Sequence, residues 1–319
     1  MLSPLDCIRR FVFMYSLSTC WNSGRHTCGR QMLREIRDLG FEYAELSHGI
    51  RISLVPGIIE AVEAGEIRIS TLHNFCPLPI GINHAAPNIF KFTAEDARER
   101  MSAWKHTLKT LEMAERVKAR LVVLHCGEVT MRDYNEKLEA MVARGEQESS
   151  RYRRLVEEAE SKRERGKEQA VDLALEMIQR IAGEASNRGL LLGVENREAI
   201  EEIPFDYELP AFLAQLPENV RYWHDCGHAQ IKENLGFVQH IMQVEELAPR
   251  LAGFHVHDVV ADAEGQHDHC PPGSGTIRYD LLRPYVRAEH IKVLELSPGI
   301  PPEAVRQGYE FIRSVWGAE

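Results

Sequence analysis

The sequence of 319 residues has only seven cysteines, and no two of them form a Cys-x-x-Cys pair. This argues against a disulfide framework and a cysteine-based zinc knuckle, and is typical of a reducing compartment. Basic residues are also few: 38 Lys and Arg stand against 48 Asp and Glu, a formal net charge of −10. An acidic chain does not offer the positively charged surface that binding of a nucleic-acid phosphate backbone needs. Nucleic acid is therefore a disfavoured partner, although a local basic patch would leave it open.

Long hydrophobic runs are missing as well, since no stretch approaches the roughly 18 apolar residues that a membrane-spanning helix needs. The run Phe11–Leu17 follows Arg9-Arg10, as in a secretory signal peptide. It is short, however, and Trp21-Asn22-Ser23-Gly24-Arg25 stands where a small-residue cleavage site should be. We therefore expect a first buried strand here, and a cytoplasmic protein with no membrane partner.

The sequence also lacks the glycine-rich first turn that a doubly wound open sheet would favour. It has instead eight apolar runs of strand length: Phe11–Ser18, Phe41–Ser47, Ile67–Phe75, Leu121–Cys126, Leu190–Asn196, Val220–Cys226, Leu251–Asp258 and Ile291–Ser297. Helix-like segments lie between and after them: Arg30–Leu39, Asp96–Ala119 with Thr93 as its N-cap, Asp172–Arg188 and Pro302–Trp316. This alternation predicts an α/β fold, a (β/α)8 TIM barrel, with the open sheet as the alternative.

The interval between the fourth and fifth strands, residues 127–189, is longer than one crossover helix needs. Residues 131–167 are rich in Glu, Arg and Lys and contain few apolar residues. We interpret the interval as a helical insertion exposed to solvent. The alternative is a lid over the barrel mouth or a contact between subunits of a homo-oligomer. Because no linker, repeat or low-complexity tract is present, residues 1–319 are expected to form a single TIM-barrel domain.

Histidine and acidic residues gather where the strands end, and the carboxyl ends of barrel strands build the active site. The ends of the third to eighth strands and the loop after the seventh carry His73, His125, Glu195 with Arg197, Asp225 with His228, His255 with His257, Glu295, and His267-Asp268-His269. Carboxylates that point into a barrel mouth are costly to desolvate and repel one another, and a divalent cation would compensate them. Imidazole together with carboxylate suits Zn²⁺, Mn²⁺ or Fe²⁺ better than Ca²⁺ or Mg²⁺.

The alternation of side chains along a strand sorts neighbouring candidates. If Glu195 points into the barrel, Arg197 does so too, whereas Asn196 faces away. His255 and His257 share one face, so alternation leaves both open as the ligand from the seventh strand.

With Glu195, Asp225, His255 and Glu295 identified, the sequence resembles the xylose isomerase-like TIM-barrel superfamily. This group includes sugar-phosphate isomerases and epimerases, inosose dehydratases and endonuclease IV. The resemblance runs from about Phe11 to Trp316. Its motifs are Val194-Glu195-Asn196, Asp225-Cys226-Gly227-His228-Ala229, Phe254-His255-Val256-His257-Asp258, Asp268-His269-Cys270-Pro271-Pro272-Gly273-Ser274-Gly275 and Leu294-Glu295-Leu296.

The epimerase-like branch holds one metal ion with Glu, Asp, His and Glu from strands five to eight. The resemblance therefore implies the ligands Glu195, Asp225, His255 and Glu295, and it favours His255 over His257. The endonuclease IV branch holds three zinc ions with additional histidines, which match His73, His125, His228 and His269. That branch has an Asp two residues before the histidine that matches His269. This chain has His267 at that position, and we keep His267 as a candidate metal ligand.

The first function that the resemblance implies is a divalent-metal-dependent isomerase or epimerase, or a related dehydratase, of a small sugar, sugar phosphate or polyol. One Mn²⁺ or Zn²⁺ ion, or more than one, would act as a Lewis acid on adjacent substrate oxygens. The catalytic residues Glu195 and Glu295 would remove and return the proton. The candidate substrate contacts are Arg197, His228, His257 and Glu45, with an ion pair at the rim as the alternative for Arg197 and Glu45.

The alternative function is an endonuclease IV-like multi-zinc phosphodiesterase that acts on abasic DNA. The additional histidines favour it, whereas the net charge and the absence of an evident basic, aromatic-interleaved DNA-binding loop oppose it. Residues 151–167 carry seven basic and four acidic residues, but they also fit a helix of mixed charge. A barrel that binds metal without catalysis is a third possibility. We expect small-molecule chemistry.

Overall fold

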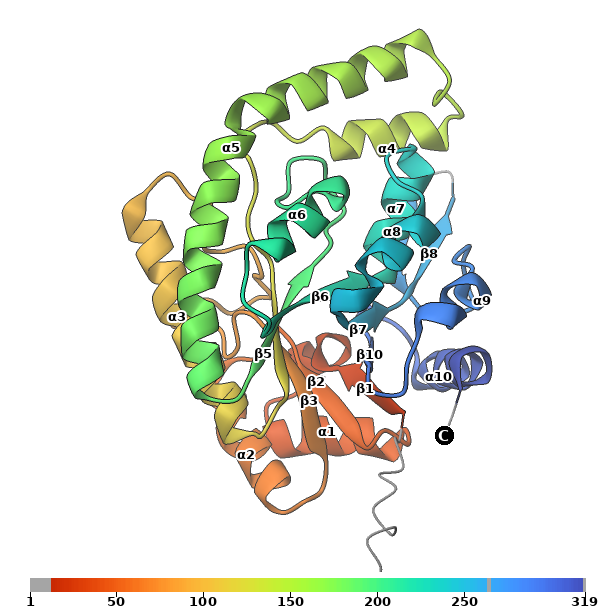
Figure 1. Cartoon of the computed structure of the whole chain (residues 1–319). Coiled ribbons are helices and arrows are strands. Elements are labelled where there is room, and N and C mark those ends of the chain that lie inside the picture. Colours follow the sequence, from red (N-terminus) through yellow and green to blue (C-terminus); the bar gives the residue numbers. More distant parts are fainter. Residues whose placement is uncertain (1–12, 263–264, 318–319) are drawn as a thin grey trace, which may run out of the picture.

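Eight parallel strands close into a barrel in the computed structural model of the chain, which describes residues 13–262 and 265–317 (Figure 1). Around the barrel their order is β1-β10-β7-β6-β5-β4-β3-β2. The strands are β1 (Met14–Ser18), β2 (Tyr43–Leu46), β3 (Arg68–His73), β4 (Leu121–Leu124), β5 (Leu191–Glu195), β6 (Val220–Asp225), β7 (Leu251–Val256) and β10 (Ile291–Leu294). Each lies inside one of the eight apolar runs, so the predicted (β/α)8 TIM barrel is confirmed. Phe11 and Arg9-Arg10 lie outside the described residues.

Apolar side chains fill the end of the barrel at which the strands begin. Met14, Leu121, Trp223, Ile291 and Val293 form a buried cluster there. Two glycines make room for the indole. A Cβ atom on Gly253 would lie 2.4 Å from Trp223 Cζ3, and one on Gly193 would lie 3.1 Å from Trp223 Cβ. The cluster closes the barrel at this end, so only the opposite end is available for a site.

Helices surround the barrel: α1 (Gly29–Asp38), α2 (Val55–Glu63), α3 (Ala97–Arg116), α4 (Asn135–Ala143), α5 (Ser150–Asn187), α6 (Leu209–Ala214), α7 (Cys226–Leu235), α8 (His240–Leu247), α9 (Tyr279–Leu282) and α10 (Pro302–Trp316). One expected helix start was wrong. Asp96 caps α3, because its side chain accepts a hydrogen bond from the backbone N–H of Arg98. Thr93 instead donates to the carbonyl oxygen of Glu128, and so ties the loop before α3 to the segment after β4.

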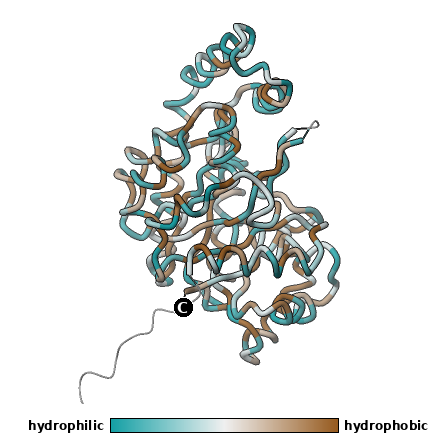
Figure 2. The backbone as a smooth tube through the Cα atoms, turned by 90° about the vertical axis from the view of Figure 1, so that its right-hand side faces the viewer, coloured by the Kyte–Doolittle hydropathy of each residue, from teal (hydrophilic) through white to brown (hydrophobic). Residues whose placement is uncertain are grey.

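The interval between β4 and β5 contains α4 and the long helix α5, which form the expected helical insertion; the predicted helix Asp172–Arg188 is the last part of α5. Figure 1 shows α5 crossing above the barrel, with α4 beneath it, and then descending beside α3. Along the tube in Figure 2, hydrophilic residues prevail in the part that projects. The first half of α5 is nevertheless not fully solvated. Tyr152 donates to the carbonyl of Leu235, and Arg163 is buried against Glu208 at 2.6 Å. The segment is thus the expected helical insertion exposed to solvent, with one buried stripe of Tyr152, Leu155, Ala159 and Arg163.

A β-hairpin that was not predicted follows β7. It consists of β8 (Asp258–Ala261) and β9 (Gln266–Cys270), which pair in antiparallel orientation. The side chain of Asp258 accepts hydrogen bonds from the backbone N–H groups of Gly273 and Ile277, and so fixes the loop that follows the hairpin. The hairpin carries residues 267–269 to the barrel mouth.

Among the described residues, no helix is long and apolar enough to cross a membrane. The single-domain organisation, the cytoplasmic location and a homo-oligomeric state stay predictions from the sequence.

Candidate metal centre

Four side chains from strands that are neighbours in the barrel meet at its carboxyl end. Glu195 and Asp225 end β5 and β6, His255 lies in β7, and Glu295 follows β10 directly. Their ligand atoms all lie within 4.8 Å of one another. His255 Nδ1 is 2.6 Å from Glu195 Oε1, 3.1 Å from Glu295 Oε2 and 3.7 Å from Asp225 Oδ2. The structure thus brings together the four residues predicted as principal ligands.

This cluster concentrates negative charge where water has little access. All four side chains are buried. Burial alone would raise the pKa of Glu195 and Glu295, but the facing His255 outweighs it and holds both pKa values well below the usual range. Burial alone would lower the pKa of His255, but Glu295, Glu45 and Glu195 raise this pKa well above its ordinary value. Three ionised carboxylates around one imidazole form a donor set that suits a divalent cation.

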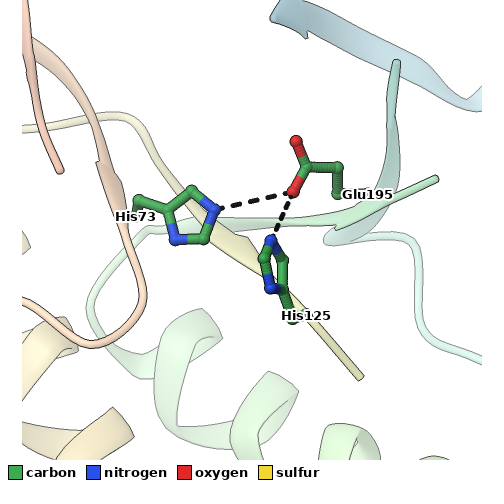
Figure 3. Close-up of side chains that lie close together, drawn as sticks. All are labelled: His73, His125 and Glu195. Carbon is green, nitrogen blue, oxygen red and sulfur yellow. Dashed lines mark hydrogen bonds and ion pairs between the residues drawn. The ribbon is translucent and has the colours of Figure 1, made fainter. Parts of the chain in front are cut away.

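A second group shares Glu195 with the first (Figure 3). Oε2 of Glu195 lies 2.8 Å from His125 Nε2 and 3.5 Å from His73 Nε2, whereas Oε1 faces His255. His73 donates its Nδ1–H to the carbonyl oxygen of Asn74 at 2.9 Å, so in the neutral ring Nε2 carries the lone pair. Burial and the nearby Arg197 lower the pKa of His125 to about 3, which keeps its ring neutral. The two oxygens of Glu195 thus face two different groups of side chains, each of which could hold a cation.

Two further groups contain His228. One joins it to Asp225 and His257, and the other joins it to Glu198 and Asp268. Asp225 is the N-cap of α7 and accepts from the backbone N–H of His228 at 2.7 Å, so one carboxylate both begins the helix and belongs to the centre. His228 and Asp268 line the same cavity as the first two groups.

The side chains of His267, Asp268 and His269, which follow one another in β9, point in different directions. His269 adopts a left-handed backbone conformation with φ of 52°, which interrupts the alternation along β9. His269 Nδ1 is 2.9 Å from Asp268 Oδ2, and its Nε2 points toward Glu295 at 3.8 Å. His267 is 47% exposed and lies 3.0 Å from Asp262. His267, expected as a metal ligand, thus faces away from the centre, and Asp268 lies there in its stead.

A cavity of about 330 Å³ opens beside the centre. Arg197 is the one lysine or arginine in its lining among the described residues. Its Nε donates to Glu202 at 2.9 Å, and its Nη1 is 3.6 Å from Glu195. The lining also contains hydroxyl and imidazole groups, from Ser23, Ser47, His48 and Ser297. The arrangement offers hydrogen-bond partners for a small polar molecule next to the cluster.

Two candidate substrate contacts, His257 and Glu45, are fully buried and do not belong to this lining. His257 Nδ1 accepts from the backbone N–H of His269, so Nε2 carries the proton that faces the two oxygens of Asp225 at 3.0 Å each. In this position His257 holds Asp225 in place. A contact of either residue with substrate stays a prediction.

Sequence reasoning missed two residues of the site. Asn196 accepts from the backbone N–H of Asp225 and donates to its carbonyl oxygen, so it joins the ends of β5 and β6. His48 lines the cavity, and its buried Nδ1 has no hydrogen-bond partner among the described residues. His48 follows the second apolar run by one residue, so the rule that found the other histidines at strand ends could have found it.

A model of the family described as xylose isomerase-like TIM barrel matches residues 33–315. No curated protein matches the sequence at a significant level. The fold is similar to that of a D-tagatose 3-epimerase-like protein, with a TM-score of 0.66, 15% identity and coverage of 95% of this chain and 96% of the other. A 3-keto-D-glucoside 4-epimerase from E. coli has a TM-score of 0.66 at 14% identity, with coverage of 95% and 99%. A D-psicose 3-epimerase has a TM-score of 0.64 at 15% identity, with coverage of 95% and 99%.

Proposed function

The chain belongs to the xylose isomerase-like TIM-barrel family, and from this premise we propose that it is a divalent-metal-dependent isomerase or epimerase, or a related dehydratase, of a small sugar, sugar phosphate or polyol. The observation that carries the proposal is the convergence of Glu195, Asp225, His255 and Glu295 beside a cavity of about 330 Å³. This volume is in the range of small-molecule sites. The sugar epimerases with the same fold give further support.

Four residues, Glu195, Asp225, His255 and Glu295, would hold one Mn²⁺ or Zn²⁺ ion. His73, His125 and the second oxygen of Glu195 would hold another. When bound, such an ion polarises a substrate carbonyl and makes the adjacent C–H bond more acidic.

The two glutamates would carry the proton. Glu195 and Glu295 are both held ionised by their neighbours, so each can accept a proton from carbon and then donate it. If one removes the proton and the other returns it to the opposite face, the configuration at that carbon inverts. If the β-hydroxyl leaves instead, the product is that of a dehydratase. A well-placed acid–base group of this kind contributes about 10²- to 10⁴-fold to the rate.

Arg197 and His228 would orient the substrate. Both line the cavity, and Arg197 Nη1 lies 3.2 Å from His228 Nδ1. Glu202 keeps the guanidinium in this position from the side away from the cavity. The hydroxyl groups of Ser23, Ser47 and Ser297, which line the cavity, would bind substrate hydroxyls.

The group of His73, His125 and Glu195 favours a second candidate, an endonuclease IV-like phosphodiesterase, because clustered zinc ions can generate hydroxide near neutral pH. The acidic lining opposes it. Four carboxylates and one arginine, already paired with Glu202, would meet a phosphate backbone. We therefore rank small-molecule chemistry first.

One experiment separates the two candidates. Metal-stripped protein is reloaded with Mn²⁺ or Zn²⁺ and incubated in D₂O with a panel of ketoses, ketose phosphates and inososes, and in parallel with duplex DNA that contains an abasic site. We expect metal-dependent incorporation of deuterium into one or more of the carbohydrates and no cleavage of DNA. Glu195→Gln should abolish the exchange, whereas the exposed Glu218→Gln is the matched control. DNA cleavage without deuterium exchange would favour the second candidate.

A further inference from the structure

Glu45 is a buried carboxylate that no step of the proposed reaction uses. It lies in β2, has no exposed surface and is not part of the cavity lining. Its Oε2 accepts a hydrogen bond from the hydroxyl of Thr71 at 2.9 Å and lies 3.1 Å from Nε2 of His255. The contact between Glu45 and His255 joins β2 and β7, which are not neighbours in the barrel.

Both ring nitrogens of His255 face carboxylates, but only Nδ1 faces members of the metal group, at 2.6 Å from Glu195 and 3.1 Å from Glu295. A carboxylate oxygen accepts hydrogen bonds, so the Nε2–H of His255 donates to Glu45. In the metal-free protein Nδ1 carries a proton as well, and a cation that takes Nδ1 would displace that proton. A cation that takes Nδ1 would leave the hydrogen bond to Glu45 intact. Carboxylates behind ligating histidines fix the ring in this way and make it a better donor.

We propose that Glu45 is a positioning residue: it holds His255 with Nδ1 toward the centre and thereby raises the affinity of the centre for a divalent cation. The inference rests on the proposed metal centre and deepens it.

The remaining contacts of Glu45 do not favour a purely structural role. Its Oε1 is buried and has no hydrogen-bond partner among the described residues. A buried carboxylate with one unpaired oxygen destabilises the fold, so a neutral side chain of the same shape should be tolerated at least as well. A structural residue and a positioning residue therefore give different results when the charge alone is removed.

The test compares metal affinity with the stability of the metal-free protein. Metal-stripped wild type, Glu45→Gln and Glu45→Ala are titrated with Mn²⁺ and Co²⁺ by calorimetry, and thermal unfolding is recorded without metal. We expect Glu45→Gln to weaken binding about 10- to 100-fold, while its unfolding temperature without metal stays the same or rises. The visible spectrum of bound Co²⁺ should also shift, because the orientation of His255 changes.

Thr71→Val gives a second, milder variant, because it removes one hydrogen bond to Glu45 and keeps the charge; we expect a few-fold loss of affinity. Ser16→Ala is the matched control, since Ser16 is also buried in the barrel and donates to Ser70 instead of Glu45. Equal affinities in wild type, Glu45→Gln and Thr71→Val would overturn the role of Glu45 alone. A wild type that binds neither ion would overturn the metal centre itself, and the proposed function with it.

Discussion

The two ends of the barrel interior are built from the same strands and differ sharply in chemistry. Leu121 and Val123 of β4 fill the closed end, and the next residue on the same face is His125. Ile291 and Val293 of β10 lead in the same way to Glu295. Two residues along a strand thus separate a packed apolar core from a cluster of charges. This arrangement lets the closed end stabilise the fold while the open end carries groups that the fold does not need.

The difference between the ends is also energetic. Burial of apolar surface contributes roughly 25 cal/mol per Å², so the closed end stabilises the barrel. At the open end Glu195, Asp225 and Glu295 lose water and repel one another, and in the metal-free protein the facing histidines compensate this cost. Substitutions at the open end should therefore impair metal binding and chemistry before anything else, whereas those at the closed end should lower stability alone.

The largest effect is expected at the open end. Glu195→Gln removes the carboxylate that both candidate cations would share, so we predict a loss of activity of at least about 10³-fold and a marked loss of metal affinity. The free energy of unfolding of the metal-free protein should also fall, because His255 loses the buried carboxylate that faces it at 2.6 Å. Calorimetric metal titration, deuterium exchange and urea unfolding check the three expectations. A variant that turns over normally would remove Glu195 from the mechanism.

At the closed end, Leu121→Ala tests the opposite half of the comparison. Leu121 is fully buried and belongs to the apolar cluster at the closed end, which contains no residue of the metal groups. Its truncation should lower the free energy of unfolding by about 2–5 kcal/mol. Metal affinity of the folded protein should change less than threefold. Urea unfolding gives the first value and calorimetry the second, with the exposed Ile52→Ala as the control. A collapse of metal affinity in this variant would show that the two ends are coupled.

Lys292 of β10 is a buried titratable group near the closed end, and it tests how the apolar end tolerates a charge. Its Nζ donates to the carbonyl oxygens of Arg287 and His290, and burial lowers its pKa to about 7. Between pH 7 and about 10.4, the usual pKa of lysine, the unfolded chain binds a proton that the folded protein does not, so stability should rise with pH by up to about 1.4 kcal/mol per pH unit. Below pH 7 both states are protonated and the rise ends.

Lys292→Met removes this titration. The variant loses hydrogen bonds to three carbonyl oxygens, those of Arg287, Ala288 and His290, so its stability at a single pH is not the informative value. The informative value is the difference between the wild-type and variant stability curves measured by urea unfolding from pH 6 to pH 10. Parallel curves would mean that Lys292 keeps its charge in the folded protein.

The strands could be predicted from local rules, and the principal cluster from the strand ends together with the family resemblance, which favoured His255 over His257. Apolar runs of strand length mark the barrel, and alternation places Glu195 and Arg197 on one face. The partner of His255 could not be predicted, since Glu45 lies 210 residues away and meets it only across the closed barrel. That α5 begins at Ser150 and runs unbroken to Asn187 could not be predicted, because its first half has mixed charges and only a narrow apolar stripe. The extent of such a helix depends on contacts such as that of Arg163 with Glu208.

The smallest expected effect is in the hairpin after β7. The sequence predicted His267 at the metal centre, whereas the structure places Asp268 there. Alternation puts His267 and His269 on one face, but the positive φ of His269 turns Asp268 and His269 together toward the mouth. Asp268→Asn keeps the shape and removes the charge beside His269 Nδ1, so we expect a two- to tenfold loss of kcat/KM or metal affinity. His267→Gln should change either value by less than twofold, because His267 faces solvent and Asp262. Steady-state kinetics and metal titration on both variants measure the contrast, and equal losses would mean that the hairpin acts as a unit and not through Asp268.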